Sequence, residues 1–365
     1  MMRMKYKLGE IFEVGSGGTP SKSHPEYYGG SIPWIKTGDL KNEYLYEAED
    51  YITESGLNNS SAKIYEPDTV LIAMYGATIG ATSILKINAC TNQACAAFKK
   101  SEKVLPEYLY YFFKSQKERF VKGGVGGAQP NISARYLKKV ELEVPMVERQ
   151  TQIVRILDKI NKTIDTRKIE LEELDNLIKS RFVELFGDEN NSKKWEVVNV
   201  EDVANVQVGV VIKPSQYYTD ETNGVRAFRS LNIGEGYIKD NDWVYFTREG
   251  HQKNAKSILN ENDLLIVRSG APGTACVVTK EYEGYNAIDI IIAHPNLENV
   301  NPYYLCAYTN MPHGKKQIVE GTGGAAQQHF NVGKYNKLHL MLPPMEIQEE
   351  FEKFVHQIDK LKLIQ

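Results

Sequence analysis

The spacing of apolar residues changes along the chain, and one long stretch has the periodicity of an amphipathic helix. Between residues 153 and 185, apolar side chains recur mostly at intervals of three, four and seven residues, and charged residues fill most other positions. This pattern predicts a helix of about 40 residues, or about 60 Å if unbroken, and Gly187 follows it as a helix C-cap would. Because globular helices average about 11–12 residues, we expect this segment to form a helical arm.

Short apolar runs of strand length lie on both sides of the predicted arm. Residues 70–77 and 264–271 each contain such a run, and each run breaks at a glycine, Gly76 or Gly270. A continuous apolar run that ends at a glycine is typical of a buried strand entering a tight turn. The region on each side of the arm is therefore predicted to be a mixed α/β globule.

The two globular regions are diverged copies of one another, with a period of roughly 190–200 residues. Each copy has an amphipathic start, a helix that begins at a proline, a Gly-rich loop, and a final strand and proline that lead into a helix. The matched segments are 8–11 with 200–203, 34–40 with 227–233, 70–77 with 264–271, 105–109 with 301–305, 123–129 with 321–327, and 144–150 with 342–348.

The second copy departs from the first at two motifs. It has residues 210–215 where the first has 17–21, and residues 288–290 where the first has 91–93. After the Gly-rich loops, Asn131-Ile132 of the first copy is matched with Asn331-Val332 of the second. Because the side chains differ at the two divergent motifs, a role assigned there is not transferred between the copies.

We expect a mixed α/β protein in which two similar globules are joined by long helices that pack as an antiparallel coiled coil. The predicted division is 1–144 and 188–343 for the globules, 145–187 for the central arm and 344–365 for a C-terminal arm. The C-terminal arm has its own apolar stripe, which would pack on that of the central arm. It has about half the central arm's length, so either this arm is shortened or another subunit covers the remaining stripe.

Composition narrows the class of protein. The chain of 365 residues is 42% hydrophobic and 25% charged, which is typical of a soluble globular protein with two to three domains. The four cysteines include no C-x-x-C pair and the seven histidines show no metal-ligand spacing, so we expect neither a disulfide framework nor a metal site. We find no apolar run long enough for a membrane span or a signal peptide, and expect a cytoplasmic protein.

Ordered short motifs carry a resemblance to a known family. They lie at residues 17–21, 32–35, 76–80, 91–93, 126–133, 144–145 and 148–150. Each motif is weak alone, but in this order and partly repeated they make the whole chain resemble the DNA specificity subunit of type I restriction-modification systems.

The resemblance implies two target-recognition domains, each reading half of a split double-stranded DNA site, and helices that set the gap. The implied partners are two methyltransferase subunits docked on the helical arms, which methylate adenine, and a motor-nuclease subunit that cleaves DNA in host defence. The methyltransferase would bind S-adenosylmethionine, so neither a cofactor nor a catalytic residue is expected in this chain. A net charge of −3 does not favour DNA binding, but a subunit that shares DNA with a basic partner need not supply all the counter-charge.

Polar residues near predicted strand ends and in the Gly-rich loops are the candidate DNA contacts. Arginine can pair with guanine, and asparagine or glutamine with adenine, whereas lysines and hydroxyl groups can contact phosphates. We expect Arg268, directly after a predicted strand, to read guanine. The predicted contacts are Thr19, Ser21, Lys22, Lys36, Asp39, Tyr75, Thr78, Asn92, Gln93 and Gln129 in the first copy, and Arg229, Asn232, Arg268, Ser269 and Gln327 in the second.

Two other classes of protein remain open. A solitary DNA adenine methyltransferase would carry an Asp/Asn-Pro-Pro-Tyr/Phe turn, but residues 301–304 lack the second proline and match a helix start in the first copy. A non-DNA scaffold built from the same duplication would not need polar residues at its strand ends. Methyl transfer by the isolated chain would favour the first alternative, and the lack of a split methylated motif would favour the second.

Overall fold

The computed structural model describes residues 4–123, 131–322 and 330–364. Backbone packing divides the chain into two compact units, Met1–Asp165 and Thr166–Gln365. Helix α6 (Val147–Phe186) runs through this division, so its first half belongs to the first unit and its second half to the second unit. The predicted arm is therefore a single helix of 40 residues.

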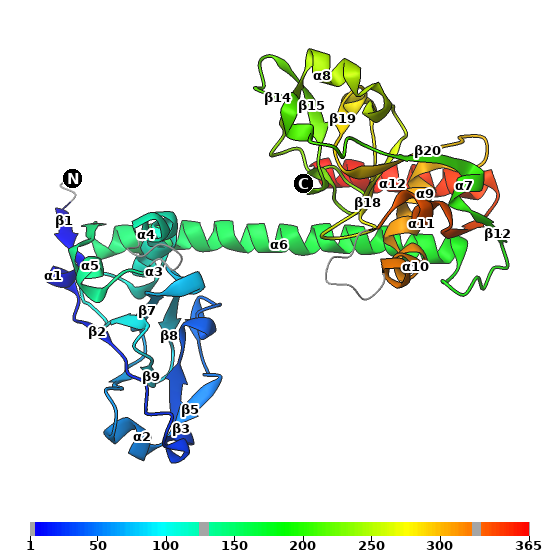
Figure 1. Cartoon of the computed structure of the whole chain (residues 1–365). Helices are drawn as coiled ribbons and strands as arrows, with labels where there is room; N and C mark the ends of the chain where they lie inside the picture. The colour runs from blue at the N-terminus through cyan, green and yellow to red at the C-terminus, as the bar shows by residue number, and fades with distance from the viewer. Residues whose placement is uncertain (1–3, 124–130, 323–329, 365) are drawn as a thin grey trace. The chain divides into compact units, whose positions relative to one another are not determined.

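The first unit consists of two sheets, a two-stranded ladder and a group of helices (Figure 1). Its strand orders are β2-β10-β7-β8-β4, β5-β3-β9-β6 and β1-β11. Helices α3, α4 and α5 lie near the first half of α6, and α2 lies at the far end of the unit beside β3 and β5. The elements are β1 Met4–Lys7, α1 Leu8–Ile11, β2 Val14–Ser16, η1 Pro25–Tyr27, β3 Tyr28–Ile35, η2 Thr37–Asp39, β4 Tyr44–Leu45, β5 Asp50–Ile52, α2 Glu54–Asn58, β6 Ile64–Tyr65, β7 Val70–Ala73, η3 Gly76–Thr78, β8 Thr82–Leu85, β9 Ala89–Thr91, β10 Cys95–Phe98, α3 Pro106–Ser115, α4 Lys117–Gly123, α5 Ala134–Lys139 and β11 Glu141–Val144.

The second unit has the same plan. Its strand orders are β13-β20-β17-β18, β14-β16-β15-β19 and β12-β21. The elements are β12 Glu196–Asn199, α7 Val200–Val203, β13 Ala204–Val208, η4 Pro214–Tyr217, β14 Tyr218–Thr219, β15 Gly224–Phe228, η5 Ser230–Asn232, β16 Val244–Thr247, α8 Arg248–Lys253, η6 Ala255–Ser257, β17 Leu264–Val267, β18 Ala275–Val277, η7 Lys280–Tyr282, β19 Asn286–Ala287, β20 Ile290–Pro295, α9 Pro302–Asn310, α10 Pro312–Thr322, α11 Val332–Asn336, β21 His339–Leu342 and α12 Met345–Ile364. The predicted mixed α/β fold with two similar globules is confirmed. No helix in the described ranges is long and apolar enough to cross a membrane.

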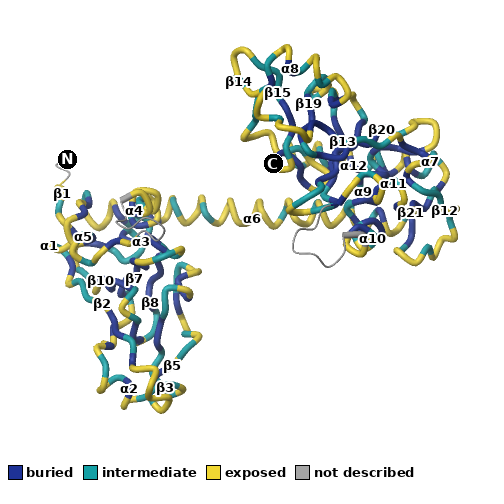
Figure 2. The backbone as a smooth tube through the Cα atoms, viewed as in Figure 1, coloured by how far each residue is buried: buried dark blue, intermediate teal, exposed yellow. Residues whose placement is uncertain are grey.

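The main core of each unit lies between a sheet and its helices. In the first unit, Phe98 of β10 packs on Phe113 of α3. In the second, Phe182 of α6 packs on Tyr304 of α9 and Phe351 of α12. All five side chains are fully buried, and Figure 2 contrasts these buried elements with the mostly exposed middle of α6. Burial of these rings holds α3 on the sheet of the first unit and holds the end of α6 on the helices of the second unit.

Equivalent backbone groups are capped in the same way in both units. The Glu10 carboxylate accepts a hydrogen bond from the Lys7 N–H at 3.0 Å, and the Asp202 carboxylate accepts one from the Asn199 N–H at 2.8 Å. Each bond satisfies a backbone donor at the start of a short helix. The predicted match of residues 8–11 with 200–203 therefore holds at the level of single hydrogen bonds.

The structure corrects the sequence alignment at the motif after β9 and β19. The Gly18 N–H donates to Thr91 O at 2.9 Å, and the Val210 N–H donates to Ala287 O at 2.8 Å. Ala287 therefore takes the place of Thr91, so the predicted match of 288–290 with 91–93 is wrong by one residue. The divergent side chains hid this shift because the equivalence is carried by backbone groups alone.

The match of Asn131 with Asn331 is also wrong, by two residues. Ser133 accepts the Tyr136 N–H at 3.1 Å and begins α5, whereas Asn331 accepts the Lys334 N–H at 3.0 Å and begins α11. Serine and asparagine are both good N-caps because their short side chains reach the free amides of the first turn. The shared function of capping, and not the shared residue type, identifies the equivalent position.

A buried glutamine ties the start of each arm to its own globule. Gln150 accepts the Leu105 N–H at 2.9 Å and donates to Pro145 O at 2.8 Å. Gln348 accepts the Asn301 N–H at 2.9 Å and donates to Pro343 O at 2.7 Å. Both glutamines are fully buried. Because all of these partners are backbone groups, the attachment does not depend on neighbouring side chains.

Within the second unit, α12 packs antiparallel to the end of α6. Lys362 pairs with Asp175 at 2.7 Å, and Glu350 pairs with Arg181. Later residues of α12 thus meet earlier residues of α6, and the buried rings described above lie between them. The predicted antiparallel packing of the two arms is confirmed for this part of the central arm.

Candidate nucleic-acid interface

Two parallel strands bring predicted contact residues together in the first unit. Strands β3 and β9 pair in parallel, with Ile35 opposite Thr91. Their carboxyl ends therefore lie at the same edge, and the next residues along each strand are Lys36 and Asn92. The Asn92 N–H donates to Ile35 O at 2.9 Å, which holds the two ends together.

A glycine lets a third segment approach the same edge. A Cβ atom on Gly17 would lie only 1.7 Å from Thr91 O, so only glycine fits this position. The chain then continues to Thr19, whose hydroxyl donates to Oε1 of the exposed Gln93. Four predicted contacts, Thr19, Lys36, Asn92 and Gln93, are thus gathered at one edge.

Lys36 and Asp39 are both engaged by other groups of the first unit. The Asp39 carboxylate accepts the Lys36 N–H at 2.7 Å, and Lys36 forms an ion pair with Asp50. Asp39 is only 8% exposed, and burial raises the pKa of its carboxyl. The structure therefore shows Asp39 closing a turn, whereas a contact of Asp39 with DNA stays a prediction.

The other predicted residues of the first unit lie in two further segments. Tyr75 follows β7, is 40% exposed and forms a bridge with Asn131, and the Thr78 hydroxyl donates to Tyr75 O at 3.3 Å. Ser21 and Lys22 are exposed in the segment that follows Thr19. Gln129 and Gln327 lie outside the described residues.

In the second unit, Arg229 and Asn232 repeat the geometry of Lys36 and Asp39. Asn232 Oδ1 accepts the Arg229 N–H at 2.9 Å, and its amide donates to Asn241 O at 2.6 Å. Asn232 is fully buried, and the Arg229 guanidinium donates to Asp242 O. Asn232 is thus occupied in holding the turn after β15, and its reading of a base stays a prediction.

Arg268 is held inside the second unit instead of pointing freely into solvent. Its guanidinium pairs with Asp289 and donates through Nε to Phe330 O at 3.3 Å. The Arg268 side chain is 16% exposed, whereas that of Asp289 is 41% exposed. Ser269, the next residue, is half-buried. Our sequence analysis did not select Asp289 as a contact, although it is the more accessible member of this pair.

Basic helices of the first unit were also missed by the sequence analysis. Residues 114–139 contain seven Lys or Arg residues and one acidic residue, in a chain with a net charge of −3. Helices α4 and α5 lie side by side, because the Phe120 and Tyr136 rings are 6.4 Å apart. The basic residues, all exposed, are Lys114, Lys117, Arg119, Lys122, Arg135, Lys138 and Lys139. A count of charge in short windows, in place of the whole chain, would have found this surface.

The corresponding helices of the second unit are less basic. Residues 312–337 contain four lysines and one acidic residue. Lys315 pairs with Glu235, and Lys337 pairs with Glu201. The first unit therefore offers the stronger basic surface for phosphate groups.

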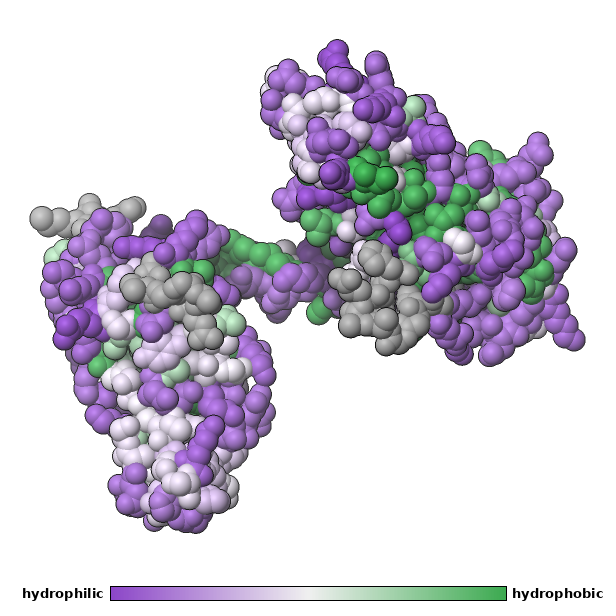
Figure 3. Space-filling view, viewed as in Figure 1, coloured by the Kyte–Doolittle hydropathy of each residue, from purple (hydrophilic) through white to green (hydrophobic). Residues whose placement is uncertain are grey.

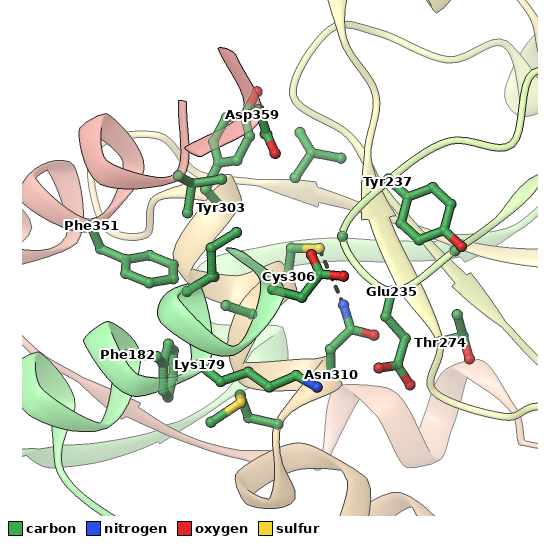
Figure 4. A pocket seen from close by; sticks show the side chains of 18 of the residues that line it. Lys179, Phe182, Glu235, Tyr237, Thr274, Tyr303, Cys306, Asn310, Phe351 and Asp359 are labelled. Carbon is green, nitrogen blue, oxygen red and sulfur yellow. Dashed lines mark hydrogen bonds between the residues drawn. The ribbon is translucent and has the colours of Figure 1, made fainter. Parts of the chain in front are cut away.

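A cavity of about 440 Å³ lies in the second unit between the helices and the segment 234–239 (Figure 4). Its floor is apolar and includes Phe182 and Phe351, and Glu235 and Asp359 stand at its sides. Asn310 donates to the Cys306 sulfur at 3.6 Å along one wall. None of the residues that line the cavity is a predicted DNA contact, so we assign it to the packing of the arm on the globule.

Comparison with known proteins identifies the family. The sequence model described as "Type I restriction modification DNA specificity domain" matches residues 3–176 and 192–365, which covers both units. The chain is 27% identical over 378 residues to the type I restriction enzyme MjaIX specificity subunit of Methanocaldococcus jannaschii, covering 96% of this chain and 85% of that one. It is 31% identical over 178 residues to the EcoR124I/EcoR124II specificity subunit of Escherichia coli, covering 46% of this chain and 44% of the relative.

Solved structures share the fold. The S subunit of a type I restriction-modification system from M. genitalium superposes with a TM-score of 0.53 at 14% identity, covering 99% of this chain and 90% of that chain. A chain from a structure on complex assembly and conformational transition of the type I R-M system gives a TM-score of 0.58 at 15% identity, covering 99% and 92%.

Proposed function

The chain belongs to the type I restriction modification DNA specificity family, and we propose that it directs such a complex to a bipartite DNA site, with one half-site per unit. The observation that carries this proposal is a shared backbone framework with different side chains at equivalent positions. A scaffold with no sequence to read would have no need for this combination. Two readers of different half-sites require it, because the framework positions the side chains and the side chains select the bases.

Three equivalent positions show the difference. Lys36 of the first unit corresponds to Arg229 of the second, and each precedes the same kind of capped turn. Met74, which is buried, corresponds to Arg268. The segment after β9 carries Gln93, whereas the segment after β19 carries Asp289. We propose that the accessible predicted residues of both units face double-stranded DNA, and that the buried Asp39 and Asn232 hold the turns that carry Lys36 and Arg229. Gln129 and Gln327, which lie outside the described residues, are proposed as further contacts.

The basic surface on α4 and α5 supports contact with the DNA backbone. Lys and Arg side chains neutralise phosphates and release counter-ions, which gives affinity without sequence preference. A cavity of about 470 Å³ beside these helices is lined by Lys5, Arg119 and Lys139 and also by Glu141 and Glu143, so the exposed lysines and arginines of the helices, and not this cavity, carry the argument. We propose that this surface holds DNA while the strand ends read it.

An exposed apolar stripe on α6 supports the docking of partner subunits. Ile156, Ile160 and Ile164 follow one another at intervals of four residues and are 56%, 48% and 46% exposed. Figure 3 shows apolar atoms gathered on α6 just beyond the globule of the first unit. Apolar side chains on one helix face favour a second apolar surface. We propose that methyltransferase subunits, which bind S-adenosylmethionine, dock on the arms of 145–187 and 344–365, and that a motor-nuclease subunit joins for cleavage.

The test is the methylated motif produced in cells. The chain would be expressed with its methyltransferase partner in a host without adenine methylation, and the genome would be sequenced by a single-molecule method. The expected result is a split adenine-methylated motif that disappears when the chain is omitted. Replacing residues of about 10–140 by those of a relative should change one half of the motif only. A continuous motif, or a change in both halves, would contradict the proposal.

The proposal also assigns no catalysis to this chain. The purified chain alone should transfer no methyl group from S-adenosylmethionine to DNA, and adding the methyltransferase partner should restore transfer. Methyl transfer by the isolated chain would instead identify a solitary methyltransferase.

A further inference from the structure

We infer that Gln93 and Asp289 select bases at corresponding positions of the two half-sites, Gln93 an adenine and Asp289 a cytosine, and that Arg268 positions Asp289. The inference rests on the proposed function and deepens it, because it assigns base chemistry to named residues. It also replaces the sequence-based expectation that Arg268 itself reads guanine.

Counted from the strand that precedes them, the two residues occupy the same place in their units. The Asn92 N–H donates to Ile35 O at 2.9 Å, and the Ile288 N–H donates to Phe228 O at 2.9 Å. These bonds make Asn92 and Ile288 equivalent, and the next residues are Gln93 and Asp289.

The strands that follow Gln93 and Asp289 are also matched between the two units. Cys95 of β10 lies opposite Ala73, and Ile290 of β20 lies opposite Val267, at the start of equivalent strand pairs. Asp289 alone therefore spans the gap that Gln93 and Ala94 span in the first unit. The single residue adopts a left-handed backbone with φ of 50°, which aspartate tolerates better than most residues.

In the first unit, a hydroxyl orients the amide of Gln93. Thr19 donates to Oε1 of Gln93, which holds the amide in one orientation at the strand end. Among the described residues, this is the hydrogen bond of the Gln93 side chain, so its two N–H groups and the second lone pair of its oxygen can face a base. A glutamine amide of this kind can donate to N7 of adenine and accept from its N6 amino group.

In the second unit, a cation orients the carboxylate. Arg268 pairs with Oδ1 of Asp289, and the arginine is itself held by Phe330 O at 3.3 Å. The Arg268 side chain is 16% exposed and that of Asp289 is 41% exposed, so the carboxylate and not the guanidinium is presented to solvent. A carboxylate is an acceptor only, and in the major groove it pairs with the N4 amino group of cytosine.

The charge of the side chain that contacts the base explains which residue lies next to it in each unit. A carboxylate close to DNA is repelled by phosphates, and an adjacent arginine cancels its charge. The neutral amide of Gln93 needs no such partner, and the position equivalent to Arg268 in the first unit is the buried Met74. The pairs Gln93 with Met74 and Asp289 with Arg268 are therefore two consistent solutions at one site.

The experiment reads the methylated motif of variants in the complete complex with the methyltransferase partner. Asp289→Ala should relax one C·G position of the second half-site, with about a ten- to hundredfold loss of preference in competition between duplexes that differ at that base pair. Arg268→Met should relax the same position, because the carboxylate loses its orientation. Gln93→Ala should relax one A·T position of the first half-site and leave the second half-site unchanged.

The alternative, in which Arg268 leaves Asp289 and reads guanine, predicts a different pattern. Asp289→Ala would then free the arginine and keep the preference for the C·G pair, whereas Arg268→Met alone would lose it. That pattern would overturn the inference. If Asp289→Ala does not fold because Arg268 is left unpaired, the double variant Arg268→Met/Asp289→Ala restores an apolar side chain and should show the same relaxed position. An unchanged motif in the double variant would likewise overturn it.

A matched control removes a carboxylate elsewhere in the second unit. Glu298 is exposed in the segment after β20, and Glu298→Ala should leave both half-sites unchanged. Failure of the proposed function is visible separately, because the unaltered chain would then yield no split motif at all. A split motif that persists in full in Gln93→Ala and Asp289→Ala would retain the function and reject the assignment of these two residues.

Discussion

Replacing Phe182 by alanine should loosen the attachment of α12 to α6 in the second unit. The Phe182 ring is fully buried and lies within 4.8 Å of the Phe186 ring, 5.2 Å of the His313 ring and 5.5 Å of the Phe351 ring, measured between centroids. Truncating a buried phenylalanine costs about 3–5 kcal/mol, because apolar contact is lost and the cavity does not close fully. The ring also lines the existing cavity of about 440 Å³, so its loss enlarges a space that the surrounding rings already leave open.

Hydrogen–deuterium exchange of peptides from α12 measures this effect locally and does not require the whole chain to unfold in one step. A loss of 3–5 kcal/mol corresponds to exchange that is about a hundredfold to several-thousandfold faster. The control is Leu177→Ala on the same helix, since Leu177 is 50% exposed and its truncation should change stability by about 0.5 kcal/mol or less. Less than a tenfold change for Phe182→Ala, or equal changes for both variants, would refute the packing argument.

Four further outcomes are expected. Gln348→Leu should lower the thermal midpoint of the second unit, because the Asn301 N–H and the Pro343 carbonyl lose their partner. Each unpaired buried group costs about 1–3 kcal/mol of stability. An unchanged midpoint would show that these two hydrogen bonds do not stabilise the unit. Inserting four residues after Asn161 lengthens α6 by about 6 Å and should widen the gap of the methylated motif by one to two base pairs. Inserting two residues rotates the apolar stripe of α6 by about 200° and should reduce methylation by the complex. An unchanged gap in an active four-residue variant would show that α6 does not set the gap. Lys139→Ala should weaken DNA binding equally for all sequences and reduce the slope of log K against log salt by about 1; a sequence-dependent loss would mark a base contact instead. Burial lowers the pKa of His313 below its usual 6.5, so the unfolded state binds more protons, and the free energy of unfolding should fall as the pH drops below about 6.5. His313→Gln should flatten this fall when unfolding by urea is measured at several pH values. An unaltered pH dependence would show that His313 does not cause it.

The sequence predicted those parts of the structure that depend on local periodicity. The long helix was foreseen because an apolar stripe of period 3.6 needs no information from elsewhere in the chain. The starts of α3 and α9 were foreseen because Pro106 and Pro302 suit the first turn of a helix. The duplication strengthened these predictions of helices and strands, because each copy supported the interpretation of the other.

The environment of the candidate site depends on distant residues and was not predictable in the same way. Asp39 and Asn232 were selected because they are polar and follow strands, but both hold turns through backbone groups. Arg268 was expected to read guanine, but its guanidinium pairs with Asp289, which lies 21 residues along the chain. Whether a polar side chain faces solvent or satisfies a buried group is decided by tertiary packing, which neither periodicity nor residue type reveals.

The pairing of the first and last strands in each globule has a consequence for how specificity changes over generations. β1 lies beside β11, with Met4 opposite Val144, and β12 lies beside β21, with Glu196 opposite Leu342. The chain thus enters and leaves each globule at neighbouring points, through ladders of backbone hydrogen bonds that accept many side chains. Two genetic crossovers in the stretches that encode these strands would transplant an entire globule. Because Gln150 and Gln348 hold backbone groups only, an incoming globule would meet an attachment that already suits it. Under the proposed function, in which each globule reads one half-site, a new DNA target would then be acquired in one recombination event.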